Sequence, residues 1–163
     1  YFHFPKLKQV QDVIEPEEVY TEEGDKTYGL EDEPHITLLY GLHEDVTIEQ
    51  VKEVINKHDL EEKPFFIKLH NVSCFETPKY DVLKFDAEGD ILFKLNEELV
   101  SLPHTSEFPE YHPHLTIGYL NKGDGKTYVQ GFKGLKFEVL PTSIIYSQPD
   151  GTKTTIKKFT YDR

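Results

Sequence analysis

Two periods of hydrophobic and polar residues alternate along the chain. Short apolar runs, and stretches in which apolar and polar residues alternate, are typical of β-strands, because successive strand side chains point to opposite faces. They predict strands at residues 36–40, 65–74, 80–85, 114–120, 135–140, 142–146 and 154–161.

Apolar residues at helical spacing predict two helices between these strands. One begins after Thr47, with Gln50 completing a capping box, and ends near Lys57. The other begins at Asp90, which is placed to cap it, and carries three leucines on one face. This order of elements predicts an α+β fold with mainly antiparallel sheets.

One five-residue pattern occurs twice. Residues 34–38 read Pro-His-Ile-Thr-Leu and residues 113–117 read Pro-His-Leu-Thr-Ile, so the two histidines are 79 residues apart, close to half the chain. Each copy is followed later by a pair of predicted strands. The weak repeat predicts two similar lobes that face each other across a cleft within a single domain, residues 1–163.

Each copy places a histidine and a threonine on the same face of its strand, because residues two apart share a face. His35 with Thr37, and His114 with Thr116, would line the cleft while the apolar residues between them face the core. Near neutral pH one imidazole can act as a base while the other acts as an acid, and threonine hydroxyls can donate to phosphoryl oxygens. The pattern predicts phosphodiester chemistry without a metal or other cofactor.

The paired motifs resemble those of the 2H phosphoesterase superfamily, which includes LigT-like enzymes and is named for two His-x-Thr/Ser-x motifs. The likeness covers residues 28–159 and includes the segments FFIKLHNVSCF, VLKF and IIYSQPDGTKTTIKKF. It implies a bilobal fold with a pseudo-two-fold axis, two sheets around a central cleft and helices on the outside.

The same resemblance implies cleavage of a cyclic phosphodiester, or of a phosphodiester next to a 2′-hydroxyl. Carried over by motif, His35 and His114 are the acid/base pair, and Thr37 and Thr116 hold the phosphate. The sequence leaves open which histidine is the base.

The run DEPHITLLYGL further resembles phage-encoded members, including those that degrade the cyclic oligonucleotide signals of bacterial CBASS immunity. We therefore expect hydrolysis of a cyclic nucleotide or cyclic oligonucleotide, in the host cytoplasm if the chain is phage-encoded. Two alternatives stay open. One is an RNA 2′,3′-cyclic phosphodiesterase or tRNA-end processing enzyme, and the other is a non-catalytic protein that sequesters a cyclic nucleotide.

Charge and cysteine content narrow the expected ligand. The chain has 30 acidic and 18 basic residues, a net charge of −12, which argues against a protein that coats long duplex nucleic acid. Its single cysteine excludes an intramolecular disulfide, and no apolar run has the length of a membrane-spanning helix. We expect a cytoplasmic monomer whose partner is a small cyclic nucleotide or oligonucleotide, and neither duplex nucleic acid nor a membrane.

Nine of the acidic residues lie between residues 15 and 33, where Lys26 is the only basic residue. Pro16, Gly24 and the lack of a period indicate a solvated loop. Tyr20 and Tyr28 lie in this loop and are expected to be exposed, unless the loop folds over the cleft, where one of them would cover the ligand; Tyr28 is the candidate binding residue.

Other aromatic residues are candidates for binding a base. Phe75 ends a predicted strand where the superfamily commonly has a cleft aromatic, and both base stacking and core packing are open for it. Tyr146 and Ser147 occupy a similar place in the second lobe. By alternation, Tyr40 and Tyr119 share the inward face with the apolar motif residues and are expected in the core.

Two further residues are candidates for other roles, His112 as a metal ligand and Lys122 as a phosphate-binding residue. His112 lies two residues before the second motif histidine, but the proline between them and the lack of a carboxylate at ligand spacing argue against a metal site. We expect His112 near solvent at the start of its strand. Lys122 lies in the run Asn-Lys-Gly-Asp-Gly and is expected to be a solvated turn lysine.

Overall fold

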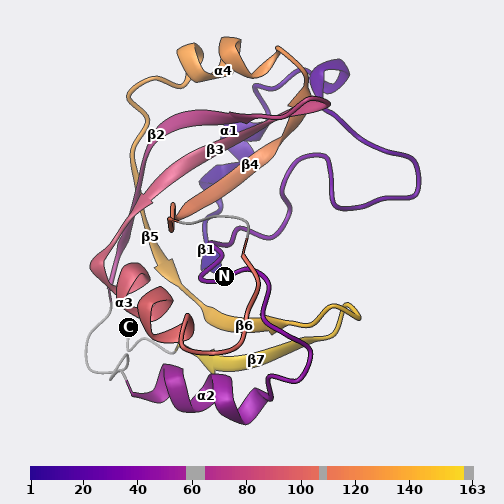
Figure 1. Cartoon of the computed structure of the whole chain (residues 1–163). Coiled ribbons are helices and arrows are strands. Elements are labelled where there is room, and N and C mark those ends of the chain that lie inside the picture. Colours follow the sequence, from indigo (N-terminus) through magenta and orange to yellow (C-terminus); the bar gives the residue numbers. More distant parts are fainter. Residues whose placement is uncertain (58–64, 107–109, 160–163) are drawn as a thin grey trace.

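The computed structural model describes residues 1–57, 65–106 and 110–159. Over these ranges the chain forms a mixed α/β structure with two antiparallel sheets, one of five strands and one of two (Figure 1). The larger sheet consists, in spatial order, of β1 (Phe2–His3), β5 (Phe137–Pro141), β2 (Ile67–Glu76), β3 (Tyr80–Glu88) and β4 (His114–Asn121). The smaller sheet pairs β6 (Ser143–Ser147) with β7 (Lys153–Lys158), and the predicted α+β class is confirmed.

Helices pack against both sheets. They are α1 (Lys6–Gln11), α2 (Ile48–Asn56), α3 (Asp90–Leu99) and α4 (Gly125–Gly131), with a 3₁₀ turn at Pro16–Glu18. Helix α4 packs on β2 and β3, and α1 contacts β4, whereas α2 packs on α3 and β7. The apolar residues accordingly form two clusters, one behind the larger sheet and one between α2, α3 and the smaller sheet.

The capping residues of the two predicted helices have different outcomes. The capping box of α2 is confirmed. The Thr47 hydroxyl accepts from the backbone N–H of Gln50, and the Gln50 side-chain oxygen accepts from the backbone N–H of Thr47. The predicted cap at Asp90 is wrong by one residue, since Gly89 is the cap and Asp90 begins α3. A Cβ at position 89 would lie 2.6 Å from Cδ1 of Ile67, which explains the glycine.

Most predicted strands are confirmed with shifted ends, and the end predicted for the last one lies outside the described residues. The strand predicted at 36–40 is wrong, because only Ile36 forms a bridge there, with Leu115. The backbone carbonyl groups of the two residues after Ile36 accept hydrogen bonds from side chains and not from a neighbouring strand. The Tyr111 hydroxyl donates to the Thr37 carbonyl oxygen, and the Asn96 side-chain amide donates to the Leu38 carbonyl oxygen.

The acidic segment is exposed over residues 21–27, as expected of a solvated loop, but the residues on either side of this stretch pair with β4. Residues 19–31, which we call the strap, leave the edge of β4 and return to it, so that the two ends of the strap pair with β4 at Val19–Leu120 and Leu30–Gly118. Tyr119 donates its N–H to the Gly29 oxygen at 2.9 Å and accepts from the Tyr20 N–H at 2.9 Å. A Cβ on Gly118 would lie 3.2 Å from the Leu30 Cα, so glycine permits this approach.

Three elements were missed by the sequence patterns: β1, α1 and α4. Each is at most seven residues long, too short to show a hydrophobic period, and α4 begins at Gly125, the last residue of the run interpreted as a turn. None of the helices in the described part of the chain has the length and apolarity needed to span a bilayer.

Candidate active site

The bridge between Ile36 and Leu115 aligns the two His-x-Thr motifs. These residues are the central ones of the two motifs, and they pair antiparallel. In an antiparallel pair each step forward on one segment matches a step back on the other, so His35 lies beside Thr116 and Thr37 beside His114. This pairing relates the motifs by a local two-fold axis and brings the four polar residues near one another, while a cleft lined by both motifs stays a prediction.

Both motif histidines are held in the same way. His35 Nδ1 lies 2.8 Å from the Glu33 carbonyl oxygen, and His114 Nδ1 lies 2.8 Å from the His112 carbonyl oxygen. A carbonyl only accepts hydrogen bonds, so Nδ1 must carry the proton in each ring. Nε2 is then the atom that accepts a proton in the neutral ring and donates one in the charged ring.

The charges around the two rings differ. Burial lowers the pKa of His114, and the cations of Lys84 and His35 lower it further, while the bond to the His112 carbonyl and the charge of Asp86 act in the opposite direction. His35 instead has a carboxylate nearby, since its Nδ1 lies 3.9 Å from Glu31 Oε1. The repeat is therefore symmetric in backbone and asymmetric in charge.

Strand β3 adds two polar residues that the sequence reasoning missed. Lys84 lies opposite Thr116 and Asp86 lies opposite His114 in the pairing of β3 with β4. Lys84 is only 7% exposed, and its Nζ donates to Asp86 Oδ1 and to Ser73 Oγ, both at 2.7 Å. A lysine and an aspartate two positions apart, flanked by the apolar residues Leu83, Phe85 and Ala87, were the signal that could have revealed them.

A bulge in β2 holds the aspartate. The register shifts between His70 and Val72, and Asn71 between them adopts the left-handed conformation with φ 48°. From there the Asn71 amide donates to Asp86 Oδ2 at 2.7 Å. Partial burial raises the pKa of Asp86, but the bonds from Lys84, Asn71 and Ser73 outweigh it, so the pKa lies below its ordinary value.

Phe75 lies on the same face of the sheet as the second motif. Its ring meets the His114 ring edge to face at 5.1 Å, and Lys84 Nζ lies 4.5 Å from the centre of the Phe75 ring. With 40% of Phe75 exposed, the core alternative is wrong for this residue. Stacking of a base on it stays a prediction.

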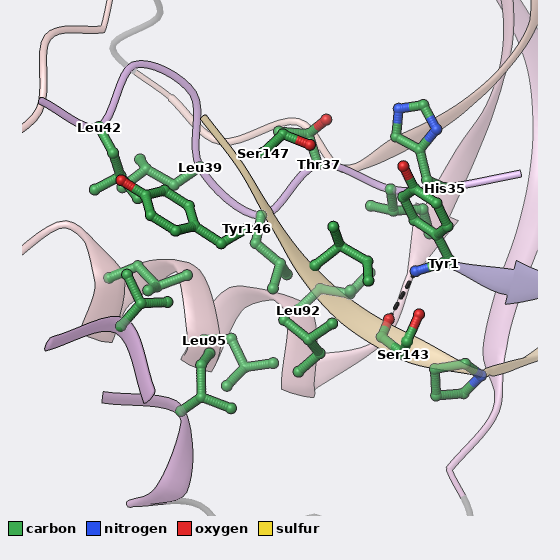
Figure 2. A pocket seen from close by; sticks show the side chains of 18 of the residues that line it. Tyr1, His35, Thr37, Leu39, Leu42, Leu92, Leu95, Ser143, Tyr146 and Ser147 are labelled. Carbon is green, nitrogen blue, oxygen red and sulfur yellow. Dashed lines mark hydrogen bonds between the residues drawn. The ribbon is translucent and has the colours of Figure 1, made fainter. Parts of the chain in front are cut away.

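A pocket of about 530 Å³ opens beside the first motif (Figure 2). His35, Thr37 and Ser147 lie along one side of it, and leucines of α3 lie on the other. Tyr146 is 6% exposed and donates its hydroxyl to the Val46 oxygen at 3.2 Å, so it forms part of the wall. The second motif is outside the set of lining residues, so the pocket adjoins the first motif alone.

The aromatic residues at the far end of β4 form a cluster of their own. Tyr20, Tyr28, Tyr80 and Tyr119 pack with ring centres 5.1–5.4 Å apart, so the exposed position expected for the first two is wrong. Partial burial and a hydrogen bond to Glu22 raise the pKa of Tyr28 to about 12. Tyr28 is not among the residues that line the pocket, and its contact with a ligand stays a prediction.

Neither tyrosine expected in the core lies there. Ile117 is an extra residue of β4, since Leu83 pairs with Gly118 and Lys84 with Thr116. This bulge reverses the alternation, so Leu120 is buried and Tyr119 faces the tyrosine cluster. Tyr40 is 48% exposed because no strand continues to it from the first motif.

The remaining candidates lie at the surface. His112 is exposed and its Nε2 is 3.6 Å from Glu110 Oε2, as expected near solvent. Lys122 is half exposed but is not simply solvated, since its Nζ lies 4.0 Å from Oδ1 of the buried Asp81. Within the described ranges, no group of three or more histidine, cysteine or acidic residues is arranged to hold a metal ion.

Comparison with known families gives one decisive finding. The family model described as the 2′-5′ RNA ligase superfamily matches residues 5–134. The chain belongs to this superfamily of 2H phosphoesterases. Both His-x-Thr motifs fall within the matched residues, and membership supports a phosphodiesterase-type activity. A search of curated proteins gives no match.

Proposed function

We propose that this 2H phosphoesterase hydrolyses a phosphodiester bond of a cyclic nucleotide or cyclic oligonucleotide, without a metal ion. The observation that supports this most directly is the antiparallel alignment of the two motifs by Ile36 and Leu115. It gives two imidazoles with the same tautomer and two hydroxyls around one axis. This is the set of groups that metal-free phosphoryl transfer needs: a base, an acid and donors for the phosphoryl oxygens.

The reaction follows from these positions. The Nε2 atom of one neutral histidine takes the proton of the attacking oxygen, and the Nε2–H of the other, charged histidine protonates the leaving oxygen. The hydroxyls of Thr37 and Thr116 donate to non-bridging oxygens of the phosphate, where negative charge increases in the transition state. Because each threonine lies beside the histidine of the other motif, we expect the phosphate to bind on the local axis.

Charge and pocket size support a compact ligand. The net charge of −12 disfavours a long polyanion, whereas a pocket of about 530 Å³ lies in the range of small-ligand sites, roughly 300–1,000 Å³. The resemblance of residues 32–42 to phage-encoded relatives supports the narrower role of degrading cyclic oligonucleotide signals of bacterial CBASS immunity. We expect the protein to act as a monomer on such a ligand.

The test is a panel of cyclic mono-, di- and trinucleotides incubated with the protein in EDTA and analysed by mass spectrometry. We expect linear products from at least one cyclic oligonucleotide, and a loss of about 100-fold or more in rate for His35→Ala and for His114→Ala. His112→Ala is the matched control, because this histidine is exposed and adjacent to the motif. Turnover at the wild-type rate by the variant that carries both His35→Ala and His114→Ala would refute the proposal.

RNA 2′,3′-cyclic ends are the second candidate substrate, including the ends of tRNA. The description of the matched family as 2′-5′ RNA ligases favours it. The same panel therefore includes short RNAs with a 2′,3′-cyclic phosphate. Opening of these ends with no change in the cyclic oligonucleotides would favour the second candidate, and tight binding without any product would favour sequestration.

A further inference from the structure

The cluster of four tyrosines lies on the face of the larger sheet that carries the second motif. Lys84 and Val82, two residues apart on β3, share one face. Their partners on β4 are Thr116 and Tyr119, and residues paired across an antiparallel sheet project to the same side. The bulge at Ile117 makes this possible, because residues three apart on a regular strand face opposite sides. Tyr119 therefore projects from the motif face, about 7 Å along it from Thr116.

Phe75 joins the tyrosine cluster to the second motif histidine. On β2 it pairs with Val82, so it lies in the same cross-strand row as Tyr119. Its ring contacts the His114 ring, with centres 5.1 Å apart. Tyr80, two residues before Val82 on β3, lies in the other direction, and its ring centre is 5.4 Å from that of Tyr119. Aromatic side chains thus follow this face of the sheet from His114 to the first residue of β3.

The strap, which lies beside β4 in Figure 1, supplies the other two tyrosines of the cluster. Tyr20 donates its backbone N–H to the Tyr119 carbonyl oxygen, and Gly29 accepts from the Tyr119 N–H, both at 2.9 Å. These bonds place Tyr28, next to Gly29, so that its ring centre lies 5.3 Å from those of Tyr80 and Tyr119. All four tyrosines are only partly buried, so the cluster keeps surface for a ligand.

The acidic residues around the cluster favour an uncharged base over a phosphate. Partial burial, a hydrogen bond to Glu22 and the charges of Glu22 and Asp25 raise the pKa of Tyr28 to about 12, so its phenol stays neutral at pH 7. Burial also raises the pKa of Tyr119, and the carboxylate of Glu31 adds to the effect. Carboxylates this close repel a phosphate, whereas the uncharged face of any nucleobase stacks on an aromatic ring.

We propose that the tyrosine cluster is a subsite for a second nucleobase of the substrate, in addition to the base expected on Phe75. This inference rests on the proposed function and names its substrate class, a cyclic di- or oligonucleotide and not a cyclic mononucleotide. The two aromatic surfaces are separate, because the Phe75 ring contacts His114 whereas the Tyr119 ring contacts Tyr28 and Tyr80. A ligand with two bases can occupy both surfaces, and a ligand with one base leaves the cluster empty.

The first experiment measures binding without turnover, in the His35→Ala background. Isothermal titration calorimetry gives the affinity for cyclic diadenylate, which has two bases, and for 3′,5′-cyclic AMP, which has one. We expect Tyr28→Leu and Tyr119→Leu to weaken binding of cyclic diadenylate by roughly 5- to 150-fold, and to weaken binding of cyclic AMP at least fivefold less. Tyr28→Phe keeps the ring and should retain the affinity, which separates stacking from the hydrogen bond to Glu22.

Phe66→Leu is the matched control, since this ring is 55% exposed and directly precedes β2, at the opposite end of that strand from Phe75. Both affinities should be the same in this variant as in its parent. The second experiment compares turnover in the otherwise wild-type protein. We expect Tyr28→Leu to raise KM for cyclic diadenylate more than it lowers kcat, and to lose at least fivefold more kcat/KM on this substrate than on 2′,3′-cyclic AMP.

Equal losses of affinity for the two ligands in the leucine variants would overturn the subsite and leave the cluster as a structural contact of the strap. Undiminished binding of cyclic diadenylate in both leucine variants, or equal affinities of the parent for the two ligands, would overturn it as well. Selective binding of cyclic diadenylate without cleavage by the wild type would instead refute the proposed hydrolysis and support the subsite. Cleavage of cyclic diadenylate at the wild-type rate by both leucine variants would support the hydrolysis and overturn the subsite.

Discussion

The Tyr111 hydroxyl is one of two side-chain donors that hold the first motif, and Tyr111→Phe tests its contribution. The Tyr111 hydroxyl donates to the Thr37 carbonyl oxygen at 2.8 Å, in a segment that forms no strand. Its removal loses a hydrogen bond and leaves a partly buried carbonyl unpaired, which costs about 1–2 kcal/mol. For a chain of this length that corresponds to a fall in Tm of roughly 2–8 °C.

The free energy lost in Tyr111→Phe also sets an upper limit on the fall in the catalytic rate. If all of this free energy is expressed as displacement of Thr37, kcat on the diester that the protein cleaves falls by roughly 5- to 30-fold. Burial raises the pKa of Tyr111, so the phenol stays protonated and this effect should be constant across neutral pH.

Tyr128→Phe is the control for this prediction. Its hydroxyl donates to Glu18 at 2.8 Å and accepts from the Glu15 N–H at 2.9 Å, and neither partner belongs to a motif. Stability measured by urea unfolding should fall in both variants, and kcat only in Tyr111→Phe. An unchanged kcat in Tyr111→Phe, together with the expected loss of stability, would show that Tyr111 does not position Thr37.

Four further predictions concern the strap, a helix cap and charge. Gly118→Ala should cost about 1–3 kcal/mol in urea unfolding, since its Cβ meets the Leu30 backbone, and no loss would mean that the strap is not packed there. Thr47→Ala should cost about 1 kcal/mol by removing the capping box of α2, as measured by the same assay. The pKa of Asp86 is below its ordinary 3.8, so its stabilisation is complete above pH 3.8 and is lost as the pH falls through the lower value. Asp86→Asn should therefore flatten the fall in Tm on acidification, and an unaltered slope would contradict this. Glu17→Gln with Glu23→Gln should raise the affinity for single-stranded RNA at low salt in a filter-binding assay, and no gain would limit these charges to solubility.

The second motif was predictable because its strand follows the alternation rule as far as the active residues. His114 and Thr116 lie on one face and Leu115 on the other, as expected for β4. The rule fails one step later, where Ile117 forms a bulge that depends on the partner strand and not on the local sequence. For this reason Tyr119 was assigned to the wrong face.

The first motif was predicted in position but not in conformation. Its apolar residues indicate a strand, yet the donors that hold it are Tyr111 and Asn96, which are distant in sequence. These long-range hydrogen bonds replace the backbone pairing of a neighbouring strand, and the residues around the motif give no sign of them. The alternation of Lys84 and Asp86 with apolar residues could have marked a polar face of β3, but only the pairing of β3 with β4 shows that this face meets the second motif.

The strap also bears on how the molecule avoids association with copies of itself. As the last strand of its sheet, β4 would otherwise present a row of free backbone donors and acceptors to a second chain. Backbone bonds from the strap occupy part of this row, and many of the excess acidic side chains lie in the strap and its flanks. Strand addition at this edge would therefore have to displace paired backbone and bring two strongly negative surfaces together. The acidic residues of the strap and its flanks thus disfavour aggregation through the edge of β4.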